Sequence, residues 1–208
     1  GLTTLKKAMI NAKKRALLYQ FARENNLPHS LAGQVLKKQM TVEEAQIRAR
    51  VIANRKVHSD HCSFEKYMQS EEPVILGLHG QENAKATILE VLNYDIKVAM
   101  KGEEQEIQKH NVKFLFLPEY RKIVNKTIKV DKVIAKNPKA PITKVAQRFR
   151  ISDDDLQKVV DLKSHVGITT LEGEKIQAEI LLYSKYEIVL GLKDEARLIL
   201  FRHCLESA

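Results

Sequence analysis

Phe201-Arg202-His203-Cys204-Leu205 lies near the end of the chain, and a weaker copy, Gln108-Lys109-His110-Asn111-Val112, lies 93 residues earlier. In both copies a basic residue precedes a histidine, and an apolar residue follows two positions later. Each copy also closes a short block of the chain in which strand-forming residues predominate. The sequence therefore contains two related blocks, each with a basic-His step near its end.

The two blocks share one layout of strands and turns. Their first three predicted strands are 74–78, 84–92 and 96–100 in the first block, and 166–170, 176–183 and 188–192 in the second. Tyr94 and Tyr186 lie 92 positions apart, in the turn before the third strand, whereas His110 and His203 lie 93 apart. A single inserted residue accounts for the difference, and turns are where insertions are tolerated. This repetition predicts a duplicated domain.

Strand periodicity is clearest in the second block. Ile176, Ala178, Ile180 and Leu182 alternate with Gln177, Glu179 and Leu181, close to the period of two of a half-buried strand. Short strands separated by glycine or charged turns are typical of a small β-barrel. Gly191, in the third strand, marks either a bend in a closing barrel or an ordinary packing position.

Both blocks resemble the Sm-like barrel of bacterial Hfq proteins, whose last strands carry a Tyr-Lys-His-Ala-Ile motif. The stretch 201–205 follows this motif closely, and 108–112 keeps its Lys-His step and its final apolar residue. Family barrels also carry an aromatic residue, after a polar one, at the turn entering the third strand, where Asn93-Tyr94 and Lys185-Tyr186 stand. The resemblance implies an α+β protein with two small, bent, five-stranded Sm-like β-barrels, each preceded by a basic helical module.

The resemblance and the distribution of charge divide the chain into four segments. We expect a helical module over 1–73, a barrel over 74–117, a helical linker module over 118–165 and a second barrel over 166–208. The helical segments each carry a net charge of +6, and the barrels carry −1 and −2. A basic flank attracts the phosphates of nucleic acid over a screening length of about 8 to 10 Å, although it is equally typical of a solvated helix surface.

The basic segments have the patterns of helices. The run 5–24 lacks glycine and proline and spaces its apolar residues by three or four positions. Two further stretches, 28–44 and 141–155, each predict a helix, a tight turn and a second helix. Thr41 and Ser152 are the expected N-caps of the second helices, because an acidic residue follows each of them by three positions.

The resemblance also implies a binding site for RNA. In Hfq-like rings, the basic-His step of one barrel and the aromatic residue of an adjacent barrel form a uridine pocket. In this pocket the aromatic side chain stacks on a base, the histidine donates to a pyrimidine carbonyl or a ribose hydroxyl, and the lysine or arginine pairs with phosphate. The residues that the resemblance assigns to this pocket are Asn93, Tyr94, Lys109, His110, Lys185, Tyr186, Arg202 and His203. The alternatives are rim-packing tyrosines and solvated basic loops.

The chain departs from the family in three respects. Hfq chains carry one barrel each and close rings of six by pairing their fourth and fifth strands, so three chains of this protein would form a ring-like pseudo-hexamer. Gln108 replaces the family's aromatic residue in the first block. The predicted fourth strand of that block, 104–108, is strongly polar, so we expect one of the two kinds of edge to pair less well.

Composition excludes several classes of protein. No apolar run approaches the roughly 20 residues that span a bilayer, so we expect a soluble protein without a membrane partner. Cys62 and Cys204 lie far apart and no secretory leader is seen, so we expect reduced thiols and a cytoplasmic location. The stretch 58–62 contains metal-ligating residue types without a second cluster, so neither a metal nor another cofactor is expected.

The function that we expect is binding of uridine-rich single-stranded RNA, as an RNA chaperone or post-transcriptional regulator of Hfq type. No glycine-rich phosphate loop, nucleophile elbow or convincing pair of carboxylates is present, so we do not expect an enzyme. One alternative is a DNA-binding regulator that uses its helix-turn-helix-like modules, although Asp153-Asp154-Asp155 would meet the DNA at the start of the reading helix. A further alternative is an assembly scaffold whose barrels have lost the pocket.

Overall fold

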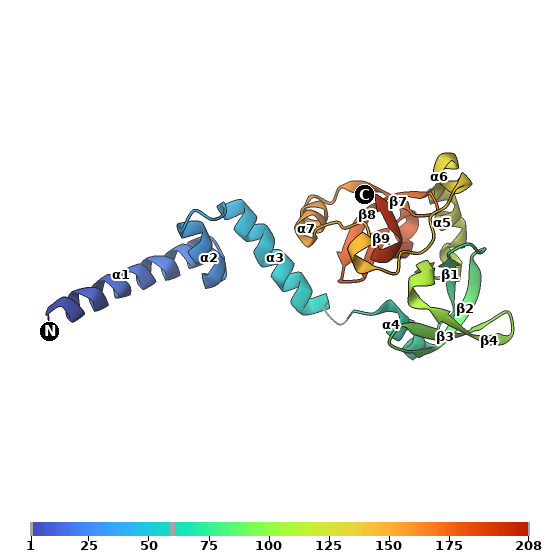
Figure 1. The fold of residues 1–208 in the computed structure, drawn as a ribbon, viewed down its shortest axis with the longest axis horizontal. Coiled ribbons are helices and arrows are strands. Elements are labelled where there is room, and N and C mark those ends of the chain that lie inside the picture. Colours follow the sequence, from blue (N-terminus) through green and yellow to red (C-terminus); the bar gives the residue numbers. More distant parts are fainter. Residues whose placement is uncertain (1, 59–60, 208) are drawn as a thin grey trace. The chain divides into compact units, whose positions relative to one another are not determined.

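The computed structural model describes residues 2–58 and 61–207, with side chains from residue 9 onward. The chain divides into two compact units, Gly1–Val57 and His58–Ala208 (Figure 1). Unit 2 contains both strand-rich blocks together with the segment that links them. The division into four segments, which the sequence predicts, stays a prediction.

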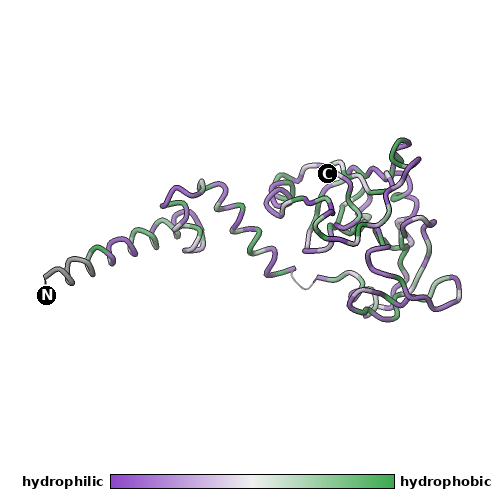
Figure 2. The backbone as a smooth tube through the Cα atoms, viewed as in Figure 1, coloured by the Kyte–Doolittle hydropathy of each residue, from purple (hydrophilic) through white to green (hydrophobic). Residues whose placement is uncertain are grey.

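Unit 1 is helical. Its helices are α1 (Leu2–Glu24), α2 (His29–Leu36) and α3 (Val42–His58). A small core around Leu31 and Ala45 forms where the end of α1 packs against the other two helices. The predicted capping box of α3 is confirmed, because Glu44 N–H donates to the Thr41 hydroxyl at 3.1 Å and Thr41 N–H donates to the Glu44 carboxylate at 2.8 Å. Most of α1 is exposed, and Figure 2 shows hydrophilic and hydrophobic residues interleaved along it.

Unit 2 is built on an antiparallel sheet of eleven strands. In chain order they are β1 (Val74–Leu78), β2 (Ala84–Val91), β3 (Asp95–Met100), β4 (Glu103–Gln108), β5 (Val112–Phe116), β6 (Lys129–Val130), β7 (His165–Thr170), β8 (Glu174–Tyr183), β9 (Glu187–Gly191), β10 (Arg197–Phe201) and β11 (Leu205–Ser207). Their order across the sheet is β11-β7-β8-β9-β10-β5-β1-β2-β3-β4, and β6 pairs with β8 beside this path. The sheet is open, because β4 and β11 each pair on one side only within the described part of the chain.

The predicted α+β class is confirmed, but two separate five-stranded barrels are not. β10 of the second block pairs with β5 of the first, with Ile199 opposite Leu115 and Leu200 opposite Phe114. The strands of both blocks therefore belong to one continuous sheet. Both strands of this seam are almost wholly buried, and pairing removes two apolar edges that would otherwise expose unpaired backbone groups.

The two blocks nevertheless repeat each other in detail. The strand order β5-β1-β2-β3-β4 in the first block matches β11-β7-β8-β9-β10 in the second. The second strand of each block has a bulge at the same place, after Ile88 in β2 and after Ile180 in β8. The extra residues, Leu89 and Leu181, are both exposed. Gly191 pairs with Glu179, just before the second bulge, and a β-carbon there would lie 2.9 Å from the Leu181 side chain, so this glycine is a packing position.

The helices of unit 2 are short. They are α4 (Ser63–Ser70), α5 (Arg121–Thr127), α6 (Lys132–Lys136) and α7 (Asp153–Leu162). The predicted N-cap of α7 is confirmed, since Asp155 N–H donates to the Ser152 hydroxyl at 3.1 Å. The helix predicted from Pro141 onward is wrong, because the segment 141–150 contains a single 3-10 turn at Val145–Gln147. This segment is mostly exposed, and a short helix is not stable without an apolar face to bury.

Two hydrophobic clusters meet along the seam between the blocks. Phe114 and Leu200 belong to one cluster, and Leu115 and Ile199 belong to the other. Successive side chains of a strand point to opposite faces of the sheet, so each cluster receives side chains from β5 and from β10. Gly77 permits close packing here, because a β-carbon at that position would lie 2.3 Å from the Phe114 ring. The blocks therefore share their cores.

Candidate functional site

The first tip consists of Asn93, Tyr94, Lys109 and His110. Asn93 and Tyr94 lie in the turn between β2 and β3, and Lys109 and His110 lie in the 3-10 turn that follows β4. Lys109 N–H donates to the Tyr94 carbonyl at 2.8 Å, and the Lys109 ammonium donates to the Asn93 carbonyl at 3.3 Å. The structure thus brings these four predicted residues together, and it leaves Tyr94 81% exposed.

The second tip consists of Lys185, Tyr186, Arg202 and His203. Arg202 N–H donates to the Tyr186 carbonyl at 2.8 Å, which repeats the bond between Lys109 and Tyr94. The Lys185 ammonium lies 4.9 Å from the centroid of the Tyr186 ring, a cation–π contact. Tyr186 is 58% exposed. These four predicted residues also lie together.

The basic residue of each tip holds the turn that carries the tyrosine. The Lys109 ammonium donates to the Leu92 carbonyl, and the Arg202 guanidinium donates to the Ser184 carbonyl at 3.0 Å. Leu92 and Ser184 occupy equivalent positions in the two blocks, because the N–H of each also donates to the backbone carbonyl of the residue three positions later. Both basic side chains therefore have a structural role. Only the N–H donors that these bonds do not use remain available to a phosphate group of a ligand.

Arg202 is bound to the protein more fully than Lys109. Its guanidinium also pairs with Asp153 at 2.9 Å and donates to the Ile151 carbonyl at 2.7 Å. Asp153 is the first residue of α7, so Arg202 ties the second tip to that helix. With three protein partners, Arg202 presents little of its charge to a phosphate group.

His203 lies between the two blocks. Its Nε2 lies 2.9 Å from the Val112 carbonyl, which can only accept, so Nε2 carries the proton. The ring stacks on Phe201 with a centroid distance of 5.8 Å. Burial lowers the pKa of His203 to about 4, and the nearby Arg148 and His110 contribute to this shift. At neutral pH the ring is uncharged, and it serves as a contact between the blocks.

The two tips adjoin each other across the seam between β10 and β5. His203 of the second tip contacts Val112, which is two residues beyond His110 of the first tip. Cys204 Sγ donates to the Lys113 carbonyl at 3.3 Å. The basic-His step of the second block therefore lies beside that of the first block.

A buried charge cluster joins the blocks near the turns that follow β1 and β7. The Lys113 ammonium of β5 pairs with the carboxylates of Glu172 and Glu174 in the second block. Glu172 also accepts from Gly80 N–H at 2.5 Å, and its carboxylate lies 3.2 Å from His79 Nδ1. Burial acts to lower the pKa of Lys113, but its hydrogen bonds to the two carboxylates outweigh this effect and raise it. These residues form the junction, in which one cation holds two carboxylates.

His79 is the uncharged member of the junction. Its side chain is 4% exposed, and burial lowers its pKa, although Glu172 acts in the opposite direction. With Nδ1–H donated to Glu172, Nε2 is left as a bare acceptor. This nitrogen has no hydrogen-bond partner among the residues that the structure describes.

A second contact holds α4, which precedes the first block and packs against its core, against β9 of the second block. The buried Glu187 carboxylate accepts from Ser63 N–H at 2.9 Å and from the Ser63 hydroxyl at 2.6 Å. Burial raises the pKa of Glu187, while the two bonds from Ser63 oppose this shift. Phe64 of α4 stacks on Phe201 of β10, with ring centroids 4.8 Å apart. Together with the junction, this contact fixes one block on the other.

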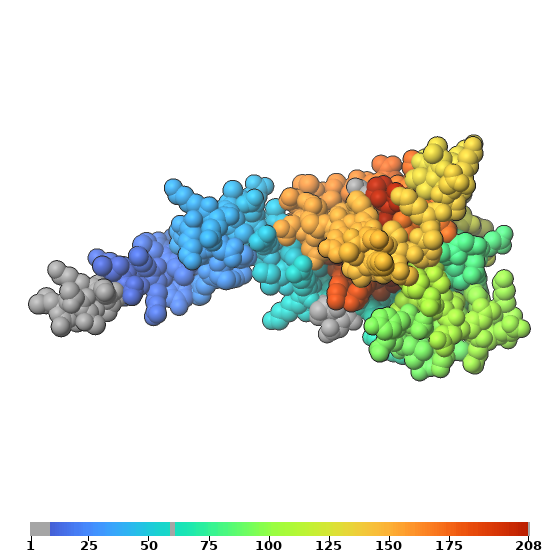
Figure 3. Space-filling view, viewed as in Figure 1, coloured from blue at the N-terminus to red at the C-terminus, as the bar shows by residue number. Residues whose placement is uncertain are grey.

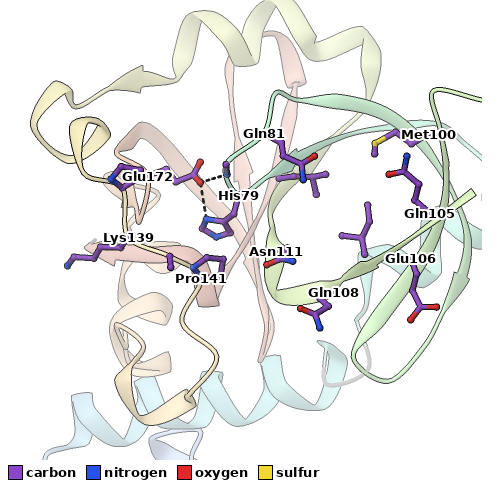
Figure 4. Close-up of a pocket in the computed structure, with 15 residues that line it drawn as sticks. His79, Gln81, Met100, Gln105, Glu106, Gln108, Asn111, Lys139, Pro141 and Glu172 are labelled. Carbon is purple, nitrogen blue, oxygen red and sulfur yellow. Dashed lines mark hydrogen bonds and ion pairs between the residues drawn. The ribbon is translucent and has the colours of Figure 1, made fainter. Parts of the chain in front are cut away.

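A cavity of about 560 Å³ lies between β4 and the junction (Figure 4). Gln105 and Gln108 of β4 line it on one side, and His79 and Glu172 lie opposite them in Figure 4. Pro141 of the linker also lines it. Amide and imidazole groups supply both donors and acceptors, so the cavity suits a polar guest or ordered water better than an apolar ligand.

Both cysteines are free thiols, as predicted. Within residues 2–58 and 61–207, no group of three or more His, Cys, Asp and Glu side chains is placed to hold a metal ion. Ser59 and Asp60, which belong to the stretch with metal-ligating residue types, lie outside the described residues. No helix in the described part of the chain is both long and apolar enough to cross a bilayer. Comparison of the chain with models of protein families and with curated proteins found no match.

Reasoning from the sequence missed the junction and the contact of Glu187 with Ser63. One signal was present, because Lys113 is the only charged residue in the strand Val112–Phe116, and a buried charge requires a partner. Glu187 likewise begins an otherwise apolar strand. The identity of each partner depends on how the two blocks pair, and no local pattern encodes that.

Proposed function

We propose that this chain is a tandem Sm-like protein that binds uridine-rich single-stranded RNA through its first tip. The observation that carries the proposal is the Tyr94 ring, which is 81% exposed on a turn held by Lys109, the residue before His110. A base that stacks on such a ring gains roughly 1 to 3 kcal/mol. Tyr94 belongs to neither core cluster of unit 2. Its ring is therefore not needed for core packing, and it is free to stack on a base.

The repeated strand order supports the Sm-like part of this proposal. The resemblance implies that the fourth strand of one barrel pairs with the fifth strand of the next. In unit 2, β10 is the fourth strand of the second block, and it pairs with β5, the fifth strand of the first block. In this proposal each block is an Sm-like barrel. The pairing of β10 with β5 is then one of the barrel-to-barrel contacts of the pseudo-hexameric ring, and it lies within a single chain.

The first tip supplies most of the proposed site. Asn93 and His110 border the base that stacks on Tyr94, and the remaining donors of Lys109 face its phosphate. The second tip contributes less, because Arg202 and His203 are held by protein partners while Lys185 and Tyr186 remain exposed. The two sites are therefore unequal, although the resemblance assigns residues of both tips to the pocket.

The free strands at the two ends of the sheet support self-association. β4 and β11 are a fourth and a fifth strand, so pairing of β4 with β11 of another chain extends the arrangement that β10 and β5 already form. Three chains of 23.8 kDa each would close the pseudo-hexamer. Light scattering at micromolar concentration tests this part, and the mass of a single chain removes it.

Fluorescence anisotropy with labelled oligo-uridine, oligo-adenine and duplex DNA tests the binding function. We expect oligo-uridine to bind most tightly, and Tyr94→Ala to weaken that binding about tenfold through loss of stacking. Tyr19→Ala is the matched control, because it removes an exposed tyrosine from unit 1. Tighter binding of duplex DNA contradicts the proposal in favour of a DNA-binding regulator, and wild-type affinity in Tyr94→Ala removes the first tip from the site.

A further inference from the structure

The linker 121–150 contains the whole net charge of the chain. It has ten Lys and Arg residues and a single acidic residue, Asp131, so its net charge of +9 equals that of the complete chain. All other residues together therefore contain as many basic as acidic side chains. The excess positive charge that could attract a polyanion is therefore concentrated in this segment.

The basic residues of the linker other than Arg148 are exposed, and few of them have acidic partners. Lys139 pairs with Glu206 at 2.5 Å, and Asp131 pairs at 2.7 Å with Lys175, which lies outside the linker. The exposed linker lysines without an ion pair among the described residues are Lys122, Lys126, Lys129, Lys132, Lys136 and Lys144. Figure 3 shows much of the linker, in yellow, spread over the face turned to the viewer. Exposed lysines without an ion pair are available to bind an anion from outside the chain.

The linker is fixed on the second block. β6 pairs with β8, Asp131 N–H donates to the Gly173 carbonyl at 2.8 Å, and Lys139 N–H donates to the Leu171 carbonyl at 3.1 Å. Gly173 has a φ of +87°, and a β-carbon there would lie 3.0 Å from the Asp131 carbonyl oxygen, so glycine permits this close approach. The backbone positions of these parts of the linker are therefore fixed relative to the second block.

The end of the linker places an aromatic ring between two cations. Phe149 is 37% exposed and stands between Arg148 and Arg150. Arg148 donates to the Ile142 carbonyl at 2.8 Å, and this bond helps to shape the loop. Cations that track a backbone, together with a ring on which bases stack, are the combination that holds single-stranded nucleic acid.

We infer that the linker 121–150 is a second RNA-contact surface, which tracks the phosphate backbone of the strand whose base stacks on the first tip. This inference rests on the proposed function. Lys113 and Arg202 are paired with carboxylates and Lys109 donates to backbone carbonyls, so the tips supply few phosphate contacts of their own. The linker supplies them.

An anionic membrane fits the linker less well than RNA does. Proteins that lie on a membrane use long amphipathic helices with tryptophan, phenylalanine or leucine on the apolar face. The helices of the linker, α5 and α6, have 7 and 5 residues, and the chain contains no tryptophan. RNA is therefore the partner that we propose for this surface.

Two triple variants of the full chain with the same loss of charge test the inference. The linker variant is Lys132→Gln/Lys136→Gln/Lys144→Gln, and the control variant replaces three exposed lysines of the two blocks, Lys85→Gln/Lys101→Gln/Lys193→Gln. Oligo-uridine affinity is measured at several salt concentrations. Each phosphate contact to a single strand contributes about 0.7 to the slope of log K against log salt, so we expect the slope of the linker variant to fall by about 2. The control variant keeps the wild-type slope.

Phe149→Ala gives an independent readout of the same surface. It removes a stacking ring without changing the charge, so we expect oligo-uridine binding to weaken about fivefold or more with the salt slope unchanged. Circular dichroism and thermal melting confirm that all variants fold. An unchanged affinity in Phe149→Ala overturns the stacking part of the inference.

The outcomes separate the inference from the proposed function. If wild-type protein binds no oligo-uridine, the proposed function fails and the inference fails with it. If wild-type protein binds and the two triple variants have equal slopes, the inference is overturned while the first tip remains the site. Sedimentation with phosphatidylserine vesicles completes the test, because vesicle binding that only the linker variant loses, with RNA binding intact, identifies a lipid-binding surface instead.

Discussion

The two tips have the same backbone geometry and differ in how far their side chains remain accessible. In each tip the N–H of the basic residue donates to the carbonyl of the tyrosine at 2.8 Å. Lys109 and His110 follow β4, which has no further neighbour in the described sheet, whereas Arg202 and His203 follow β10, which pairs with β5, and His203 contacts Val112. The same motif therefore serves as a contact between blocks where its strand is paired, and it stays available to a ligand where its strand forms an edge.

This difference changes what a motif match can predict. The basic-His step forms a 3-10 turn after the fourth strand in both blocks. It does not predict whether the histidine is free, since that depends on the neighbouring strand. In this chain β10 is internal to the sheet and β4 is at its edge, so we expect the second tip to be mainly structural and the first tip to keep the binding role.

The junction that makes the second tip internal gives the largest expected effect. Lys113→Ala leaves Glu172 and Glu174 facing each other without a cation, and removal of one partner from a buried ionic cluster costs about 3 to 5 kcal/mol. We expect this loss in the free energy of unfolding measured by urea titration at pH 7. Lys97→Ala is the matched control, because it breaks an exposed pair with Glu90 that solvent screens, so we expect little change in stability.

A compensated variant sharpens this prediction. Lys113→Met/Glu172→Gln/Glu174→Gln removes all three charges, so we expect it to recover most of the stability that Lys113→Ala loses. A loss of less than 1 kcal/mol in Lys113→Ala contradicts the role of the junction. It would also mean that the seam between β5 and β10 holds without it.

The second prediction concerns His203 and pH. The pKa of His203 is about 4 in the folded chain, against 6.5 for an ordinary histidine, so the unfolded chain binds more protons between these values. The free energy of unfolding therefore falls as the pH is lowered from about 6.5 to about 4, by about 3 kcal/mol. His203→Gln retains a donor for the Val112 carbonyl and does not titrate, so we expect its stability to fall less over the same range. Parallel stability curves for the two proteins contradict this assignment.

A third prediction compares the two basic residues directly. Arg202→Ala removes the guanidinium donors from Asp153 and from the carbonyls of Ile151 and Ser184, so we expect a loss of about 2 to 3 kcal/mol. Lys109→Ala removes bonds to carbonyls of a more exposed turn, and we expect about 1 kcal/mol. Oligo-uridine binding should show the reverse order, because Lys109 belongs to the open tip. Equal losses of stability in the two variants would remove the distinction between the tips.

Much of the strand pattern was predictable from sequence, because alternation and turn residues are local signals. The strand predicted over 74–78 has the bounds of β1, and the offset of 92 between the tyrosines also separates the two bulges. The helix predicted from Pro141 failed because local propensity was not supported by burial. The seam between β5 and β10 joined the blocks into one sheet, and that depends on contacts between residues about 85 positions apart, such as Leu115 and Ile199.

The accessibility of the candidate site was the least predictable property. Arg202 and His203 matched the Hfq motif better than Lys109 and His110 did, yet the better match is the one that the protein uses internally. Motif similarity reports the chemistry of a side chain, whereas access is decided by what packs against it. The net charge of the linker was visible in the sequence, but its exposure was not.

The smallest expected effect belongs to Tyr186, and it measures what the second tip still contributes. Tyr186→Ala removes a ring that is 58% exposed and contacts Lys185, so we expect a change in unfolding free energy within about 0.5 kcal/mol. Its neighbours Arg202 and His203 are bound to protein, so we expect oligo-uridine affinity to fall about threefold, less than in Tyr94→Ala. If the two tyrosine variants lose affinity equally, the tips are equivalent sites and the seam does not restrict the second one. If Tyr186→Ala has wild-type affinity, RNA is bound by the first tip and the second has become a structural contact.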